Sequence, residues 1–280
     1  MNLCVILTHH LDGTQGARYP VKIMSKKEII EELFRRCKAK GSLVFDNTLV
    51  RDVLRESGSS TNPYDMTKID DLSKLPQRLI DEGCTIVHLG DGRHKFLKCL
   101  DIVYHKFESI DEKEIIEWPY RPSILNDFSV SESSVLSLVN NHRIIHDFLY
   151  QDFSAAPKMY NSERKNNIYF EYYIGEEKIK VENLQIEIDL TLEFNGYVTV
   201  FEGKNTPSAS WLENCNILQL YYPFRYYYNL QAENKLLINK LSACYLIRRK
   251  HEGNSIVRLY NYTFTDPLNL SSVKLLKKRE

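Results

Sequence analysis

The sequence carries no net charge, because its 37 basic and 37 acidic residues balance. A protein that coats nucleic acid is basic overall, so the balance argues against indiscriminate DNA binding but allows a local basic surface beside an acidic site. No two of the six cysteines have CxxC spacing, and no Cys–His cluster has the spacing of zinc ligands. The cysteines therefore predict reduced, buried thiols in a cytosolic protein.

Signals for secretion, membrane insertion and several common enzyme sites are also missing. The first residues, MNLCVILTHHLDG, lack the basic start of a signal peptide, and no apolar run approaches the ~20 residues of a membrane helix. We therefore expect a cytoplasmic protein without a membrane partner. The chain has no phosphate-cradling glycine loop, no GxSxG and no convincing Cys–His nucleophile, which argues against those three kinds of site.

The first 110 residues predict a small helical domain that ends in a β-hairpin. Its predicted elements are a helix from the Ser25–Glu28 capping box to Gly41, helices over 46–56 and 71–83, and a hairpin over 84–98 that turns at Gly90-Asp91-Gly92. Three helices followed by a hairpin are the order of a winged helix-turn-helix, which docks a helix in the major groove while the wing touches the backbone. We therefore predict a DNA-binding domain over 1–110, with Arg93, His94 and Lys95 at the wing. The alternative is a small helical domain with a hairpin and no DNA role.

A polar connector over 111–130 separates this domain from a second one over 131–280. The predicted elements of the second domain are a helix over 131–152, strands over 168–174, 178–194 and 197–205, a helix over 211–231 that Pro223 kinks or ends, and strands over 243–250 and 255–264. This order predicts an α/β (α+β) fold in which helices flank a mixed central sheet. The basic tail KLLKKRE is expected to be frayed.

The stretch QIEIDLTLEFNGYVTVFEGKN, residues 185–205, alternates apolar and polar residues on both sides of an Asn-Gly pair. Asn-Gly favours a two-residue type I′ turn, and such a turn fixes the register of the two strands. Asp189 then lies opposite Glu202, and Glu187 lies opposite Lys204. Side chains alternate between the faces of a strand, so all four charged groups are predicted on one face, with the apolar core on the other.

Two carboxylates that face each other destabilise a strand pair unless a positive charge lies between them. Asp189 and Glu202 therefore predict a site for a divalent cation, and Mg²⁺ is usually held by one or two carboxylates together with water and phosphate. Lys204 stays on the same face, where it can orient a water or stabilise charge on a phosphate. The alternative is an exposed sheet face with an ordinary Glu–Lys pair.

These residues resemble the signature of the PD-(D/E)XK nuclease superfamily, an Asp late in one strand followed by Glu-x-Lys on the next. Asp189 and Glu202-Gly203-Lys204 match it, and Ile188 stands where the family has a proline before the Asp. The resemblance covers roughly residues 131–265, where the predicted order of a helix, three antiparallel strands, a helix and a further strand is that of the family's nuclease core.

The resemblance implies Mg²⁺-dependent hydrolysis of DNA phosphodiesters. It implies that Asp189 and Glu202 bind the metal, that the Gly203 carbonyl adds a ligand, and that Lys204 positions the attacking water.

Three further residues are candidates for the same site. Some members of the superfamily use an acidic residue of the first helix, for which Glu132 is the candidate, and others use a Gln on the next helix, for which Gln219 is the candidate. Glu132 is equally well explained as a charge at a helix start, and Gln219 as a surface residue. Glu187 shares the predicted face, either as a second ligand or as the ion-pair partner of Lys204.

A nuclease domain joined to an N-terminal winged-helix-like domain resembles some type II restriction endonucleases. The resemblance implies site-specific cleavage of double-stranded DNA in a prokaryotic cytoplasm, with a cognate DNA methyltransferase as functional partner. A palindromic target would be matched by a symmetric homodimer. Arg225, within YYPFRYYYN, is the candidate base contact, because Arg reads base edges; the alternative is a packed aromatic helix.

Other functions stay open at this point. A repair or recombination nuclease would recognise DNA structure or damage rather than a sequence. A winged-helix DNA-binding regulator would carry an inert nuclease-like half, which the intact Asp189, Glu202 and Lys204 disfavour. The remaining alternative is a sheet protein without a nucleic-acid partner. Metal-dependent cleavage separates the nucleases from the other two, and a discrete band pattern separates the site-specific enzyme from the repair nuclease.

Overall fold

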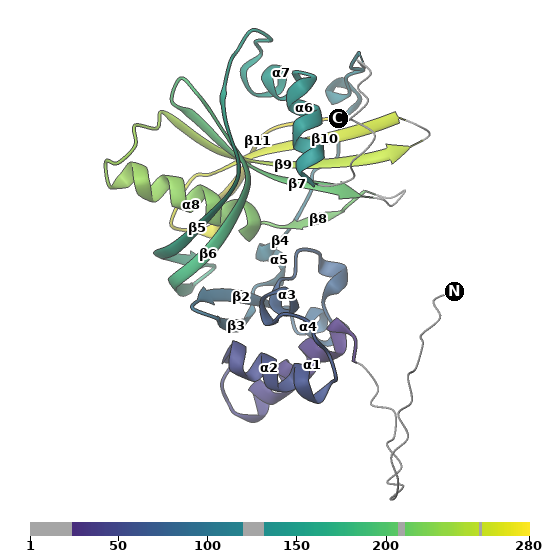
Figure 1. Cartoon of the computed structure of the whole chain (residues 1–280), viewed down its shortest axis with the longest axis vertical. Coiled ribbons are helices and arrows are strands. Elements are labelled where there is room, and N and C mark those ends of the chain that lie inside the picture. The colour runs from purple at the N-terminus through teal and green to yellow at the C-terminus, as the bar shows by residue number, and fades with distance from the viewer. Residues whose placement is uncertain (1–23, 120–131, 207–210, 252–253) are drawn as a thin grey trace, which may run out of the picture.

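A computed structural model describes residues 24–119, 132–206, 211–251 and 254–280 (Figure 1). An N-terminal unit of short helices with a small sheet packs against a C-terminal unit, in which helices flank a large mixed sheet. This arrangement confirms the predicted α+β class with a mixed central sheet. No helix in these ranges is both long enough and apolar enough to cross a membrane.

The N-terminal unit contains the predicted capping box and hairpin, but the single helix predicted over 71–83 is wrong, because the extended backbone of Leu75 and Pro76 divides it into two short helices. Its elements are α1 (Lys26–Ala39), β1 (Val44–Asp46), α2 (Asn47–Glu56), α3 (Pro63–Thr67), the 3-10 helix η1 (Leu72–Lys74), α4 (Gln77–Asp81), β2 (Cys84–Gly90) and β3 (Arg93–Lys98). The capping box forms, because the Glu28 N–H donates to the Ser25 hydroxyl and the Ser25 N–H donates to the Glu28 carboxylate. The β2–β3 hairpin is also confirmed, and β1 adds an unpredicted strand to give the order β1-β3-β2.

A short segment leads from this unit into the next. It contains α5 (Leu100–Val103), β4 (Tyr104–Lys106) and the 3-10 helix η2 (Glu112–Glu114). Strand β4 pairs with β8 (Asn214–Asn216), so the chain already contacts the C-terminal unit before residue 110.

The C-terminal unit is built on a six-stranded sheet in the order β11-β10-β9-β7-β6-β5. Its remaining elements are α6 (Glu132–Asn141), α7 (Ile144–Tyr150), β5 (Lys158–Ile174), β6 (Glu177–Phe194), β7 (Tyr197–Thr206), α8 (Leu218–Ala232), β9 (Lys240–His251), β10 (Asn254–Phe264), η3 (Leu270–Ser272) and β11 (Val273–Arg279). Strands β7 and β9 run parallel, and the other neighbouring strands run antiparallel.

Three predictions for this unit are wrong. The helix predicted over 131–152 is two helices, because the left-handed backbone of Arg143 (φ 62°) interrupts the helical hydrogen bonds. The helix predicted from residue 211 begins only at Leu218, because β8 occupies residues just before it, and it continues through Pro223. The tail that was expected to fray is β11, paired with β10.

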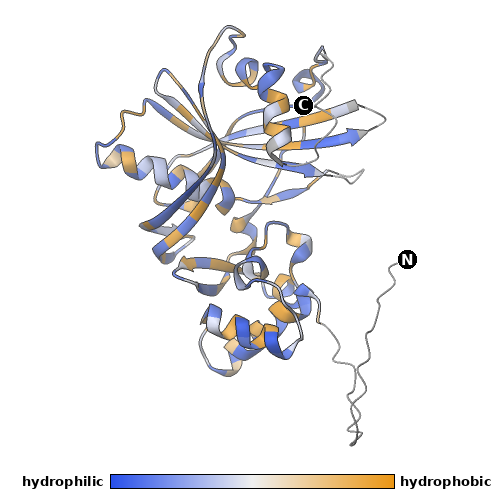
Figure 2. Cartoon of the chain, viewed as in Figure 1, coloured by the Kyte–Doolittle hydropathy of each residue, from blue (hydrophilic) through white to orange (hydrophobic). Residues whose placement is uncertain are grey.

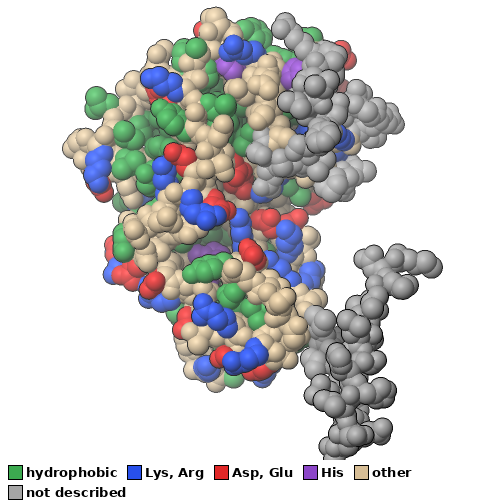
Figure 3. Space-filling model, viewed as in Figure 1, with side chains coloured by type: hydrophobic (Ala, Val, Ile, Leu, Met, Phe, Trp, Pro, Cys, Tyr) green, Lys and Arg blue, Asp and Glu red, His purple; other side chains and the backbone are tan. Residues whose placement is uncertain are grey.

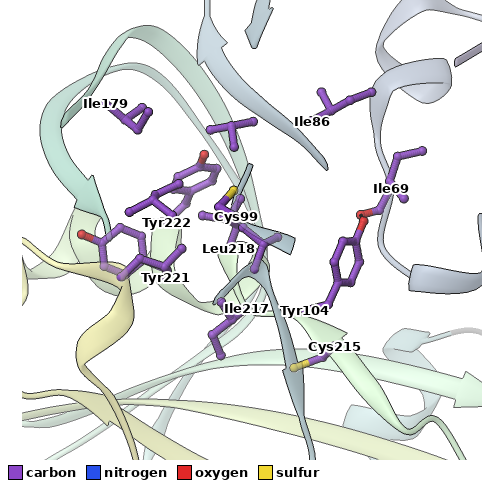
Figure 4. Packing of buried hydrophobic residues seen from close by; sticks show 14 of the residues in the cluster. Ile69, Ile86, Cys99, Tyr104, Ile179, Cys215, Ile217, Leu218, Tyr221 and Tyr222 are labelled. Carbon is purple, nitrogen blue, oxygen red and sulfur yellow. Dashed lines mark hydrogen bonds between the residues drawn. The ribbon is translucent and has the colours of Figure 1, made fainter. Parts of the chain in front are cut away.

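Apolar and polar residues alternate along the elements, as expected where each has one buried face (Figure 2). Helices α6 and α7 cover one face of the large sheet, where Val139 and Phe148 share a core with Leu192 and Phe201. The other face meets α8 and the N-terminal unit in one continuous apolar cluster. Figure 4 shows residues of both units side by side in this cluster. The shared core fixes the N-terminal unit against the sheet.

The cysteines follow their prediction where the structure describes them. The five cysteines from Cys37 onward are buried and free of disulfide bonds. Burial raises the pKa of the Cys37 and Cys84 thiols, so both stay protonated at neutral pH.

Candidate functional site

The β6–β7 hairpin forms the predicted two-residue turn. Asn195 (φ 52°) and Gly196 (φ 77°) both have the positive φ of a type I′ turn. Phe194 pairs with Tyr197, and the ladder continues in that register to Leu190 and Phe201. The predicted register is therefore confirmed over this ladder.

The ladder ends one pair before the charged residues. Asp189 does not continue it; its carboxylate Oδ2 accepts a hydrogen bond from the Gly203 N–H at 2.9 Å. Two carboxylates directly opposite each other in a ladder would repel. Here the Asp189 carboxylate instead bonds to the Gly203 N–H. The two strands still bring Asp189 and the Glu202-Gly203-Lys204 segment together, as the sequence predicts.

Glu202 is a buried carboxylate with two strong donors. The residue is 7% exposed, and its Oε1 atom accepts from the Lys204 Nζ at 2.7 Å and from the Gln219 Nε2 at 2.6 Å. A buried carboxylate is stable only when it is paired and hydrogen-bonded, and these two donors satisfy that need. Gln219, on the first turn of α8, therefore belongs to this cluster rather than to the free surface.

The donor atoms of the cluster suit a hard cation. Carboxylate, amide and backbone carbonyl oxygens are the ligands that Mg²⁺ takes, commonly with only one or two carboxylates. The Gln219 Oε1 atom is buried and has no hydrogen-bond partner in the part of the chain that the structure describes. An orphaned buried oxygen of this kind is satisfied by a water or a hydrated cation. Across the described ranges no group of three or more His, Cys, Asp and Glu side chains is placed to hold a metal, so protein ligands alone would be few.

Glu187 lies outside this cluster. Its carboxylate bonds to the Arg164 guanidinium at 2.6 Å and lies 3.7 Å from the Lys68 ammonium of the N-terminal unit. The hydrogen bond from Arg164 holds the pKa of Glu187 below its usual value. Glu132 begins α6, and its side chain lies outside the described residues.

The three predicted wing contacts are corrected by the structure, because the β2–β3 hairpin docks on β6. The Arg93 guanidinium pairs with Glu182 at 2.6 Å, and the Lys95 ammonium pairs with Glu177 at 2.5 Å. His94 is only 1% exposed. The hairpin therefore holds the two units together, and its Arg93, His94 and Lys95 side chains make contacts within the protein.

His94 instead joins a buried polar chain. Its Nδ1 lies 3.0 Å from the Nδ1 of His88, and its Nε2 lies 2.9 Å from the Asn47 Oδ1. Burial lowers the pKa of His88 to about 4 and that of His94 to about 3. Both imidazoles are therefore neutral at physiological pH.

Arg225, the predicted base contact, is also buried. Its side chain is 3% exposed, donates to the Glu171 carbonyl at 3.3 Å and lies over the rings of Phe170 and Tyr228. Burial lowers its pKa. This result corrects the prediction in favour of the packed aromatic helix.

A loop of the N-terminal unit, Lys68–Asp71, lies beside the cluster, and no local sequence pattern predicts this contact. The Ile69 carbonyl accepts from the Asn216 Nδ2 at 2.8 Å, across 147 positions of sequence. Burial opposes ionisation of Asp70 and is the largest single influence on its pKa. The hydrogen bond and charge of Lys74, together with the charge of Lys204, outweigh burial and lower the pKa of Asp70. Figure 3 shows acidic and basic side chains gathered where the two units meet.

Comparison with protein families assigns the chain without naming an activity. Residues 101–280 match the domain of unknown function DUF6997, and the chain belongs to that family. Residues 22–96 match a second domain of unknown function, DUF6996. The comparisons with curated proteins and with solved structures give no match.

Proposed function

We propose that this protein is a Mg²⁺-dependent endonuclease that cuts double-stranded DNA at specific sites, in the manner of a type II restriction enzyme with a PD-(D/E)XK core. The observation that carries the proposal is the buried cluster in which Glu202 accepts from Lys204 and Gln219 while Asp189 is fixed on the Gly203 N–H. The element order also supports it, since α7 is followed by β5, β6, β7, the short strand β8, α8 and β9.

Each residue of the cluster has a role in this proposal. Asp189, Glu202 and the Gly203 carbonyl would hold the Mg²⁺, which when bound polarises the phosphate and activates water. The Gly203 N–H orients the Asp189 carboxylate, and the Gln219 amide orients the Glu202 carboxylate. The Lys204 ammonium lies at the ligand carboxylate, where it donates to a water or a phosphate oxygen.

The DNA-reading part of the proposal has weaker support than the cleavage part. The order of helices and hairpin in the N-terminal unit supports a winged-helix-like domain, but the wing is occupied by β6. A structure- or damage-specific repair nuclease is therefore a second candidate, favoured by the internal contacts of Arg93, His94, Lys95 and Arg225. A homodimer on a palindromic site and a cognate methyltransferase belong to the restriction-enzyme proposal alone.

The test is a digest of unmethylated phage DNA with purified protein, with Mg²⁺ or with a chelator, beside a Lys204→Ala variant. The chain offers a matched control in Lys235→Ala, because Glu233 and Lys235 form a second Glu-x-Lys ion pair at 2.5 Å on the exposed surface. We expect discrete bands from the wild type and the control, and none from Lys204→Ala or without Mg²⁺. A smear that needs Mg²⁺ and Lys204 would support the repair nuclease. An absence of cutting on both unmethylated and methylated DNA would refute both nucleases.

A further inference from the structure

Asn216 joins the N-terminal unit to the helix that carries Gln219. Its Nδ2 donates to the Ile69 carbonyl at 2.8 Å, and its Oδ1 accepts from the Leu218 N–H at 3.1 Å. One side chain thus bonds at the same time to a loop of the first unit and to the first turn of α8.

The loop end of this link is fixed. The Ile69 carbonyl also accepts from the Tyr104 hydroxyl at 3.2 Å, and Ile69 itself is 3% exposed. The Lys26 ammonium donates to the carbonyls of Asp65 at 2.6 Å and Lys68 at 2.8 Å. Asn216 therefore bonds to a carbonyl that a second donor, the Tyr104 hydroxyl, also holds, and the Lys26 ammonium fixes the backbone just before it.

The helix end of the link depends on Asn216. The first N–H groups of a helix have no partner within the helix, and the residue before α8, Ile217, provides no side-chain cap. Asn216 supplies the missing acceptor to Leu218. The next residue is Gln219, which with Lys204 donates to the Glu202 Oε1, so a shift of this turn moves the amide away from the carboxylate.

We propose that Asn216 is a positioning residue of the proposed nuclease: it couples the Lys68–Asp71 loop to α8 and so holds Gln219 on Glu202. The inference rests on the proposed function, and it makes the N-terminal unit part of the cleavage site. Residues that orient metal ligands typically change activity or metal affinity by about 10- to 100-fold when they are removed. A displacement near 1 Å at a reacting group is enough for such a loss.

The test measures cleavage rate against Mg²⁺ concentration for Asn216→Ala and Asn216→Asp in the full chain. Asn216→Asp keeps the acceptor for Leu218 but loses the donor to Ile69. We expect both variants to lower kcat by about 10- to 100-fold and to raise the Mg²⁺ midpoint, with the KM for DNA unchanged. The control is Asn214→Ala, which removes an amide from the same strand without touching the Ile69 carbonyl.

Hydrogen exchange gives a readout that does not depend on activity. The first turn of α8 should exchange faster in Asn216→Ala and stay protected in Asn216→Asp. If Asn216→Ala fails to fold, Tyr104→Phe, which removes the other donor to the Ile69 carbonyl, should show a smaller loss of kcat in the same direction.

The outcomes separate the two proposals. An active wild type with Asn216→Asp at wild-type kcat and Mg²⁺ midpoint would overturn the positioning role and leave the nuclease proposal standing. A wild type that cleaves no DNA with Mg²⁺ would overturn the nuclease proposal, and the positioning role with it.

Discussion

The docking of the β2–β3 hairpin on β6 depends on Gly90, and replacing this residue by alanine tests the whole arrangement. Gly90 has a φ of +85°, and a Cβ atom added there would lie 2.0 Å from the Glu182 carbonyl oxygen. The obstacle is backbone, so no side-chain rotation removes it. In Gly90→Ala the hairpin must lift away from β6.

The cost has two parts that can be separated. An alanine in the left-handed region costs about 1 to 2 kcal/mol wherever it occurs. Lifting the hairpin also loses the Asp91 N–H bond to the Asn183 carbonyl, worth about 1 kcal/mol, and the partly exposed Arg93–Glu182 pair, worth up to about 1 kcal/mol. We therefore expect a loss of about 3 kcal/mol in the free energy of unfolding.

Urea denaturation followed by the fluorescence of the two tryptophans measures the loss. Gly41→Ala is the matched control, since Gly41 has a φ of +69° and a Cβ there would meet no atom within 4 Å. The difference between the two variants isolates the docking contribution, expected near 2 kcal/mol. Equal losses in both variants would show that the hairpin is not docked as described.

Two further predictions concern basic side chains inside the protein. Because burial lowers the pKa of His88 to about 4 and of His94 to about 3, the unfolded chain binds more protons than the folded chain below pH 6.5. The free energy of unfolding should therefore fall by about 1.4 kcal/mol for each histidine as the pH drops from 7.5 to 5.5. Denaturation over this pH range should show a smaller loss in a His88→Gln/His94→Gln variant. Arg225→Met should keep its DNA affinity in an anisotropy assay and change the free energy of unfolding by less than about 1 kcal/mol, whereas Arg225→Ala should lower that free energy by about 3 kcal/mol. A Met variant that no longer binds DNA would restore the base-contact assignment.

The features that could be predicted from sequence are those set by neighbouring residues. The capping box at Ser25 and the turn at Asn195-Gly196 each depend on a few adjacent side chains, and both form as predicted. The turn also fixes the register that brings Asp189 near the Glu202 segment, so the centre of the candidate site followed from local chemistry.

The features that could not be predicted depend on contacts between distant segments. Arg93 and Lys95 are typical surface cations in sequence, and only the position of β6 turns them into partners of Glu182 and Glu177. Arg225 is buried because aromatic rings from β5 and α8 surround it. Tertiary packing overrides local patterns in these places, and no spacing rule reports it.

Strands β7 and β9 form the parallel pair of the large sheet, and this pair joins its two halves. Strands β5, β6 and β7 follow one another in the chain, and so do β9, β10 and β11. Among the described residues, the β7–β9 pair is the strand ladder that joins these two halves. A parallel pair needs a long crossover, here through α8, so it closes later than the local hairpins. Glu202 and Lys204 lie on β7 within this parallel pair, where they face Tyr245 and Ile247 of β9. The β6–β7 hairpin by itself brings Asp189 to the Glu202 segment, but Gln219 reaches Glu202 only when the crossover helix α8 is in place. An incomplete chain would therefore carry the carboxylates and the lysine without the amide that orients Glu202.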